Sequence, residues 1–139
     1  MNKLLSMLCC AVMLLLTAAC TSNNGDIGEI FGQWKLERID TQGMTTDPTP
    51  GLTMTWAFQN TTVRVLQMTD AHQYRESYGN FRIADETLFL DFADEDYPML
   101  IPDIPRQSEW QILHLDKSKL TVRYQYPDES SMIWYFKKW

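Results

Sequence analysis

Hydrophobic and polar residues alternate along most of the chain after residue 31. Residues 52–59 (LTMTWAFQ) alternate large apolar with small or polar side chains, and residues 120–126 (LTVRYQY) repeat the pattern. A period of two is typical of β-strands, whose successive side chains point to opposite faces. Beyond the first 19 residues, no segment of ten or more residues has a helical period, and only residues 26–30 are expected to form a helical turn. The pattern therefore predicts an all-β fold.

We expect eight strands, bounded by turn-forming residues. They are placed at 32–40, 52–59, 61–69, 72–83, 87–92, 108–115, 119–126 and 131–138. The short connections at Asn60, 84–86 and 116–118 are typical of hairpins, so consecutive strands should pair antiparallel. Eight such strands hide their edges most simply by closing into an up-and-down barrel, with a two-sheet sandwich as the alternative.

Two connections are long, at 41–51 and 93–107, and both contain several prolines. In an up-and-down barrel they are the first and fifth connections, so both should lie at the same rim, where a mouth is expected. Residues 97–105 (YPMLIPDIP) are apolar for a surface connection. They either fold over the mouth as a lid or present an apolar patch to a protein partner.

The first 19 residues are organised as a secretory signal peptide. Lys3 precedes an apolar run from Leu4 to Leu16, and small residues precede Cys20. The run is too short to cross a bilayer as a helix. We assign 1–19 to the signal peptide, 20–30 to a polar, flexible tether and 31–139 to the barrel domain.

Residues 16–20 (LTAAC) resemble the lipobox of bacterial lipoproteins, although Leu16 stands one position earlier than the usual leucine. The resemblance implies that Cys20 is lipidated and anchors the protein in the bacterial cell envelope, facing the periplasm or the surface. Cleavage by an ordinary signal peptidase, which would leave Cys20 as a free thiol, is the alternative. In the first case Cys20 alone provides the membrane attachment.

Charge and composition exclude several functions. The net charge of −6 argues against binding to nucleic acid or to anionic lipid. All three cysteines lie at or before position 20, so the domain has no disulfide network. His72 and His114 are expected at opposite barrel ends and lack the spacing of zinc ligands, and the acidic residues 94–96 are interpreted as a solvated rim rather than a calcium site. Without a nucleophile or cofactor motif, we predict neither an enzyme nor a cofactor or metal site.

Gly32-Gln33-Trp34 matches the Gly-x-Trp signature at the first strand of lipocalins, and residues 134–139 (WYFKKW) resemble their last strand. The chain therefore resembles a lipocalin-like bacterial envelope lipoprotein. The resemblance implies that Trp34 plugs the closed end with a cation from the last strand, here Lys138, across its indole; the family usually has arginine there. Gly32, Trp34 and Lys138 are thus the predicted closed-end residues, and a plain core role for Trp34 is the alternative.

Alternation places a set of large side chains inside the barrel. The predicted ligand-binding residues among them are Met54, Trp56, Phe58, Tyr74, Tyr78, Trp110, Tyr124 and Trp134. The other predicted inward residues are Trp34, Leu36, Ile112, Val122 and Phe136. An eight-stranded barrel either holds one small ligand or is filled by its own side chains. We therefore predict binding of a small apolar or amphipathic molecule at the open end. The alternative is a ligand-free module that contacts a protein partner through residues 93–107.

Overall fold

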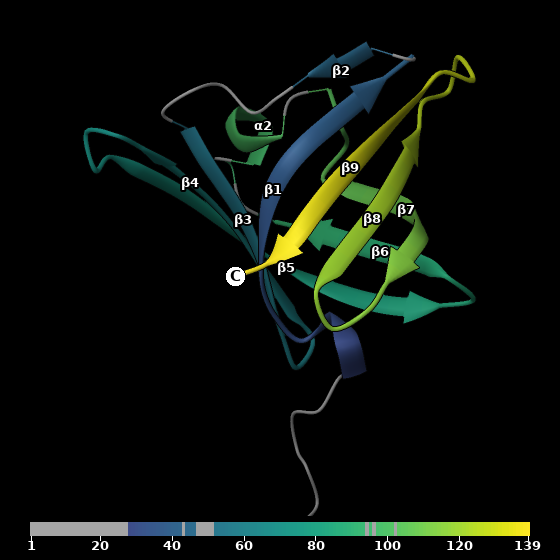
Figure 1. Cartoon of the computed structure of the whole chain (residues 1–139), viewed down its shortest axis with the longest axis horizontal. Helices are drawn as coiled ribbons and strands as arrows, with labels where there is room; N and C mark the ends of the chain where they lie inside the picture. The colour runs from purple at the N-terminus through teal and green to yellow at the C-terminus, as the bar shows by residue number, and fades with distance from the viewer. Residues whose placement is uncertain (1–27, 43, 47–51, 94, 96, 102) are drawn as a thin grey trace, which may run out of the picture.

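The computed structural model describes residues 28–139 except 43, 47–51, 94, 96 and 102, and this part forms one antiparallel β-barrel (Figure 1). The predicted signal peptide and Cys20 lie outside the described residues. Strands dominate, with one 3₁₀ turn, η2, and one short helix, α2. In chain order the elements are η2 Gly28–Ile30, β1 Gly32–Thr41, β2 Met44–Thr46, β3 Leu52–Gln59, β4 Thr62–Thr69, β5 Tyr74–Ala84, β6 Thr87–Phe92, α2 Tyr97–Leu100, β7 Gln107–Leu115, β8 Lys119–Gln125 and β9 Ser131–Lys138.

Pairing between the first and last strands closes the barrel. From β3 to β9 each strand pairs antiparallel with its successor, and β1 pairs with both β3 and β9. The β1–β9 ladder runs from Trp34 opposite Lys138 to Thr41 opposite Met132. The eight-stranded up-and-down barrel is therefore confirmed, and the sandwich alternative is wrong.

The predicted strand positions agree with the structure to within two residues at each end. The pattern missed β2 and α2, which lie in the two long connections. Only the first part of β1, from Gly32 to Lys35, pairs with β3. The short strand β2 pairs with the last part of β1, from Ile39 to Thr41. This short strand therefore continues the edge of β1 that β3 leaves free.

The core consists of every second residue of the barrel strands. On β4 the valines Val63 and Val65 point inward and are fully buried, whereas Leu66 and Met68 are half-buried on the outer face. The buried apolar residues of β3, β6, β8 and β9 follow the same alternation. They are Met54, Trp56, Phe58, Leu88, Leu90, Phe92, Leu120, Val122, Tyr124, Trp134 and Phe136.

The two ends of the barrel are closed by different means. Figure 1 shows η2 at one end, which we call the narrow end, and β2 with α2 at the other, the wide end. At the narrow end, Ile30 is buried and its carbonyl oxygen accepts a 2.7 Å hydrogen bond from Nε1 of Trp34. The folded part therefore includes the last residues of the segment predicted as a tether.

Residues of the fifth connection cover the wide end. The helix α2 packs against β4 and β5, and the Tyr97 ring stacks on Phe92 with centroids 4.6 Å apart. Leu100, Ile101 and Ile104 are also buried. The burial of Leu100 and Ile101 agrees with the lid interpretation and excludes these two side chains from an exposed apolar patch. The side chain of Met99, which the lid interpretation also includes, lies outside the described residues. We call the described residues between 97 and 104 the lid. Among the described residues, no helix has the length and apolar character needed to cross a bilayer.

Candidate functional site

The barrel interior contains six of the eight predicted ligand-binding residues. Trp56 lies at their centre, and its ring centroid is 5.3 Å from that of Trp110, 5.5 Å from that of Trp134 and 4.9 Å from that of Phe136. The contacts are perpendicular or tilted, the arrangements that aromatic rings prefer. The six residues, all buried, are Met54, Trp56, Phe58, Trp110, Tyr124 and Trp134.

The prediction that Tyr74 and Tyr78 face the interior is wrong. Their side chains are 66% and 50% exposed on the outer wall. The strand β5 instead turns Ser77 and Gly79 inward. A Cβ atom on Gly79 would lie 2.8 Å from the Phe92 ring and 2.6 Å from a backbone oxygen of β6, so Phe92 already fills this space.

Ser77 is an interior polar residue that the sequence did not indicate. It is fully buried, and it belongs to the same cross-strand row as Val65 and Trp56. A serine between two tyrosines suggests a polar face of β5, because alternation usually places the larger apolar side chains inside. Only the small residue at position 79 hinted that this face of the strand packs against a neighbour.

The interior is electrically neutral. Among the described residues, the buried polar or charged residues are Thr55, Ser77 and Ser108, none of which carries a charge. The Tyr97 phenol is uncharged at neutral pH, and burial raises its pKa further above its ordinary value. An enclosed molecule therefore meets aromatic rings, aliphatic side chains and a few uncharged polar groups.

The interior indoles fall into two classes by their hydrogen bonds. Nε1 of Trp34 donates to the Ile30 oxygen, and Nε1 of Trp110 donates to Oγ of Ser108 at 3.0 Å. Nε1 of Trp56 and Nε1 of Trp134 are buried without a partner among the described residues, and so is Oγ of Ser77. Since nine-tenths or more of buried polar groups in proteins are paired, three unpaired groups in one interior are unusual.

The predicted closed-end residues come together at the narrow end. Nζ of Lys138 lies 4.2 Å from the centroid of the Trp34 ring and donates hydrogen bonds to the backbone oxygens of Phe31 and Glu29. Burial lowers the pKa of Lys138. Gly32 has φ +110°, and a Cβ there would lie 3.0 Å from Cε of Lys138. The backbone angle therefore favours glycine at position 32, and a larger residue would also displace the end of the Lys138 side chain.

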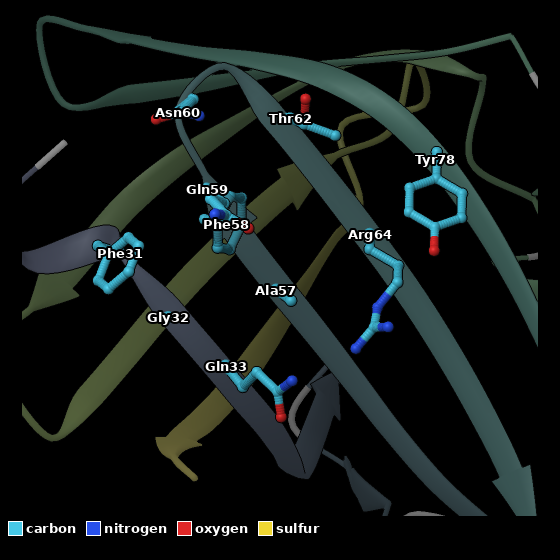
Figure 2. Close-up of a pocket in the computed structure, with 10 residues that line it drawn as sticks. All are labelled: Phe31, Gly32, Gln33, Ala57, Phe58, Gln59, Asn60, Thr62, Arg64 and Tyr78. Carbon is cyan, nitrogen blue, oxygen red and sulfur yellow. The ribbon is translucent and has the colours of Figure 1, made fainter. Parts of the chain in front are cut away.

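A hollow of about 690 Å³ lies on the outer wall (Figure 2). The strand register aligns Gln33, Ala57, Arg64 and Tyr78 in one row across β1, β3, β4 and β5. Figure 2 shows the Gln33 amide and the Arg64 guanidinium on either side of Ala57, whose small side chain leaves the depression. The hollow is open to solvent and encloses nothing, so it is a weaker candidate than the interior for a small apolar ligand.

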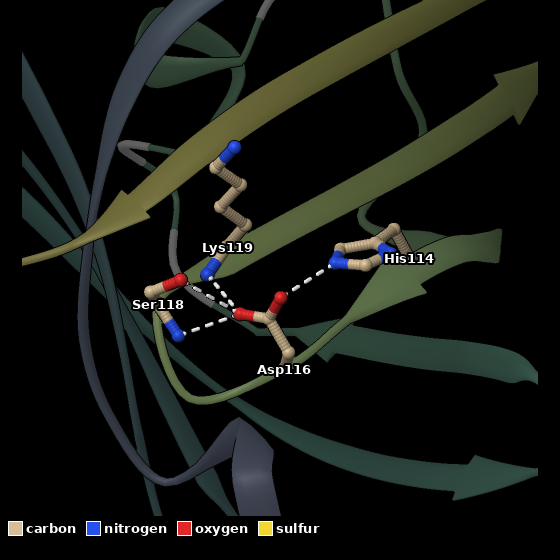
Figure 3. A network of polar contacts seen from close by, with 4 residues as sticks. All are labelled: His114, Asp116, Ser118 and Lys119. Carbon is tan, nitrogen blue, oxygen red and sulfur yellow. Dashed lines mark hydrogen bonds and ion pairs between the residues drawn. The ribbon is translucent and has the colours of Figure 1, made fainter.

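His114 belongs to a polar network in the turn between β7 and β8 (Figure 3). Its Nε2 lies 2.8 Å from Oδ2 of Asp116. Oδ1 of Asp116 accepts hydrogen bonds from the backbone N–H groups of Ser118 and Lys119 at 2.7 and 2.8 Å. His72 lies in the turn between β4 and β5, at the other end of the barrel. Within the described part of the chain, no group of three or more metal-ligating side chains is assembled.

We expect the Asp116 network to stabilise the fold in a pH-dependent manner. The hydrogen bond from His114 and those from the turn hold the pKa of the Asp116 carboxyl well below its ordinary value. A carboxyl whose pKa is lower in the folded state stabilises the protein above its unfolded pKa and loses this effect as the pH falls towards the folded value. Asp116→Asn should therefore lower the thermal midpoint at pH 7. The difference in midpoint between the variant and the wild type, called the gap below, should become smaller below about pH 4. Circular dichroism melts at pH 7 and pH 3 measure the gap, and a gap independent of pH would contradict the prediction.

Comparisons with known proteins agree on one fold. A family model described as a lipocalin-like domain matches residues 13–133. The chain is similar to the crystal structure of a lipocalin-like protein from Bacteroides uniformis ATCC 8492, with a TM-score of 0.65, 16% identity and coverage of 81% of this chain and 100% of that one. It is also similar to an uncharacterized protein from Bacteroides eggerthii DSM 20697, with a TM-score of 0.63, 14% identity and coverage of 78% and 98%. No curated protein sequence matches the chain.

Proposed function

The chain belongs to the lipocalin-like domain family, and on that premise we propose that it binds a small apolar or amphipathic molecule inside the barrel, beneath the lid. The proposal describes a binding protein rather than an enzyme. Both histidines lie in or next to turns at the barrel ends, and the interior offers rings and neutral donors rather than groups that transfer protons.

The difference between the two ends of the barrel is the observation that carries the proposal. The narrow end is fixed by Trp34, which bonds to the Ile30 oxygen and lies beneath Lys138. The wide end is covered by a connection whose apolar side chains pack inward and whose helix α2 has only four residues. A container for a ligand needs such a permanent floor and a cover that can open without breaking the strand ladders.

The chemistry of the interior supports an apolar or amphipathic ligand. Trp56, Trp110 and Trp134 present large aromatic surfaces, which bind apolar groups through burial and dispersion. Charged residues are absent from the described buried set, so an ionic ligand would lose its hydration without a compensating partner. Pockets lined mainly by apolar and aromatic side chains with a few polar groups are typical of small-molecule sites.

We propose in addition that the barrel is attached to the bacterial cell envelope through lipidated Cys20. The lipobox-like residues 16–20 support this, and the net charge of −6 argues against attachment through a basic protein surface. Intact-mass measurement of protein from the envelope fraction would report an acylated cysteine as the first residue. Acylation that persists in Cys20→Ser would contradict the assignment.

Titration with the neutral fluorescent probe N-phenyl-1-naphthylamine tests the interior site. We expect saturable 1:1 binding with quenching of tryptophan emission, because the indoles of Trp56, Trp110 and Trp134 lie inside. Ser77→Leu enlarges an inward side chain and should weaken binding at least about tenfold, because the larger side chain occupies space that the probe would take.

The matched control is Ala57→Leu, which adds the same side chain to the outer hollow and should leave probe affinity unchanged. A thermal melt of each variant shows that it is folded. Loss of binding in Ala57→Leu with retention in Ser77→Leu would move the site to the outer wall and contradict the proposal.

A further inference from the structure

Three unpaired polar groups border one part of the barrel interior. Trp56 lies opposite Val65, and Val65 lies opposite Ser77, so the inward side chains of β3, β4 and β5 form one row. The Trp134 ring lies 5.5 Å from the Trp56 ring across the interior. The same row continues to Trp34 on β1, which lies opposite Trp56, and α2 packs against β4 and β5.

Among the described interior indoles, only those of Trp56 and Trp134 lack an acceptor. Trp34 and Trp110 are equally buried, yet each indole N–H has an acceptor. Trp56, Trp134 and Ser77 are 0%, 4% and 0% exposed and have none among the described residues. Burying a donor without an acceptor is destabilising, so a fold that retains three of them is expected to gain an acceptor from a bound molecule.

The chemistry of the donors limits the class of that molecule. An indole N–H only donates, so the ligand must offer an acceptor atom, most simply an oxygen. A carboxylate would be buried without a cation, because the described buried residues include no lysine or arginine and the chain carries a net charge of −6. A carbonyl or hydroxyl oxygen on an apolar body meets both conditions.

We propose that the ligand is a neutral molecule with a carbonyl or hydroxyl oxygen, and that this oxygen accepts hydrogen bonds from Nε1 of Trp56 and Nε1 of Trp134. Ser77 supplies the third polar contact through Oγ. The proposal rests on the proposed function and adds to it the functional group that the interior selects.

Three probes of similar size test the selection: 2-ethylnaphthalene, 2-acetylnaphthalene and 2-naphthoate. The first two differ by one carbonyl group, and the third replaces it with a carboxylate. We expect the ketone to bind at least about tenfold more tightly than the hydrocarbon, because its oxygen pairs with buried indole donors that the hydrocarbon leaves unpaired. We also expect it to bind more tightly than the carboxylate.

Indole N–H resonances of ¹⁵N-tryptophan-labelled protein report the hydrogen bonds directly. The ketone should move the Nε1–H signals of Trp56 and Trp134 downfield. The signals of Trp34 and Trp110 serve as internal controls, because their N–H groups already have acceptors within the protein. The hydrocarbon should produce no such downfield shift.

Trp56→Phe and Trp134→Phe retain an aromatic ring and remove the donor, and each should reduce the preference for the ketone to less than about threefold. Ser77→Ala should reduce it less. Trp139→Phe changes an indole that is 63% exposed on the outside and should leave the preference intact. The resonance shifts in the wild-type protein keep the test decisive if a phenylalanine variant does not fold.

The outcomes separate this proposal from the proposed function. Equal affinity for ketone and hydrocarbon without indole shifts would overturn the acceptor proposal and leave interior binding intact. Tighter binding of 2-naphthoate would overturn the requirement for a neutral ligand. Binding of none of the three probes, together with no uptake of N-phenyl-1-naphthylamine, would overturn both.

Discussion

Trp34→Ala is expected to lower the free energy of unfolding by about 3–5 kcal/mol, as truncation of large aromatic residues in protein cores does. Three contacts are lost together. The fully buried indole leaves the narrow end, the Ile30 oxygen loses its donor, and Lys138 loses the ring beneath its ammonium group. The substitution therefore removes the floor of the barrel, and η2 should detach from β1.

Guanidinium chloride unfolding followed by circular dichroism measures the loss. Trp34→Phe retains a ring but not the N–H donor and should cost less than the alanine variant. Trp139→Ala is the matched control, since that tryptophan is 63% exposed at the chain end and its truncation should change stability by less than about 0.5 kcal/mol. An unfolding midpoint in Trp34→Ala equal to that of the wild type would exclude Trp34 from the structural core.

The sequence predicts this barrel well because antiparallel neighbours follow one another along the chain. Hairpin turns fix which strands pair, and a period of two fixes their type, so β3, β6 and β9 begin and end where the pattern places them. The strand β2 has only three residues and exists because β1 extends beyond its pairing with β3. Such a strand forms because an unpaired edge of β1 is available in the folded barrel, and its own sequence gives little indication of it.

The face of β5 that points into the barrel is a feature that the sequence pattern did not predict correctly. The strand has aromatic residues at both parities, with Tyr74 and Tyr78 on one face and Phe81 on the other. The ring of Phe92, from β6, fills the space beside Gly79 and decides which face turns inward. Which face of β5 turns inward depends on a packing contact between strands, so the alternation of residues along β5 alone does not predict it. For the same reason, the sequence pattern did not predict that Ser77 is a polar residue of the interior.

Trp56→Ala is expected to cost about 3–5 kcal/mol as well, because the indole is fully buried and contacts four other rings. The surrounding rings come from three strands that are each paired on both edges, so they cannot collapse fully into the space. The variant should therefore retain an apolar cavity beside Trp110 and Trp134, and such cavities bind small aromatic molecules. Urea unfolding measures the loss of stability, and Tyr74→Ala, on the outer wall, is the control with little expected change.

Rescue by a free ring distinguishes a cavity from general disorder in this variant. A molecule that binds only the folded state raises stability in proportion to the logarithm of its concentration over the dissociation constant. Millimolar indole should therefore raise the thermal midpoint of Trp56→Ala, and it should not raise that of Tyr74→Ala. A midpoint of Trp56→Ala that indole leaves unchanged would mean that Trp110, Trp134 and Phe136 have moved into the space. The interior would then be a self-sealing core, and the case for a ligand beside Trp56 would fail with it.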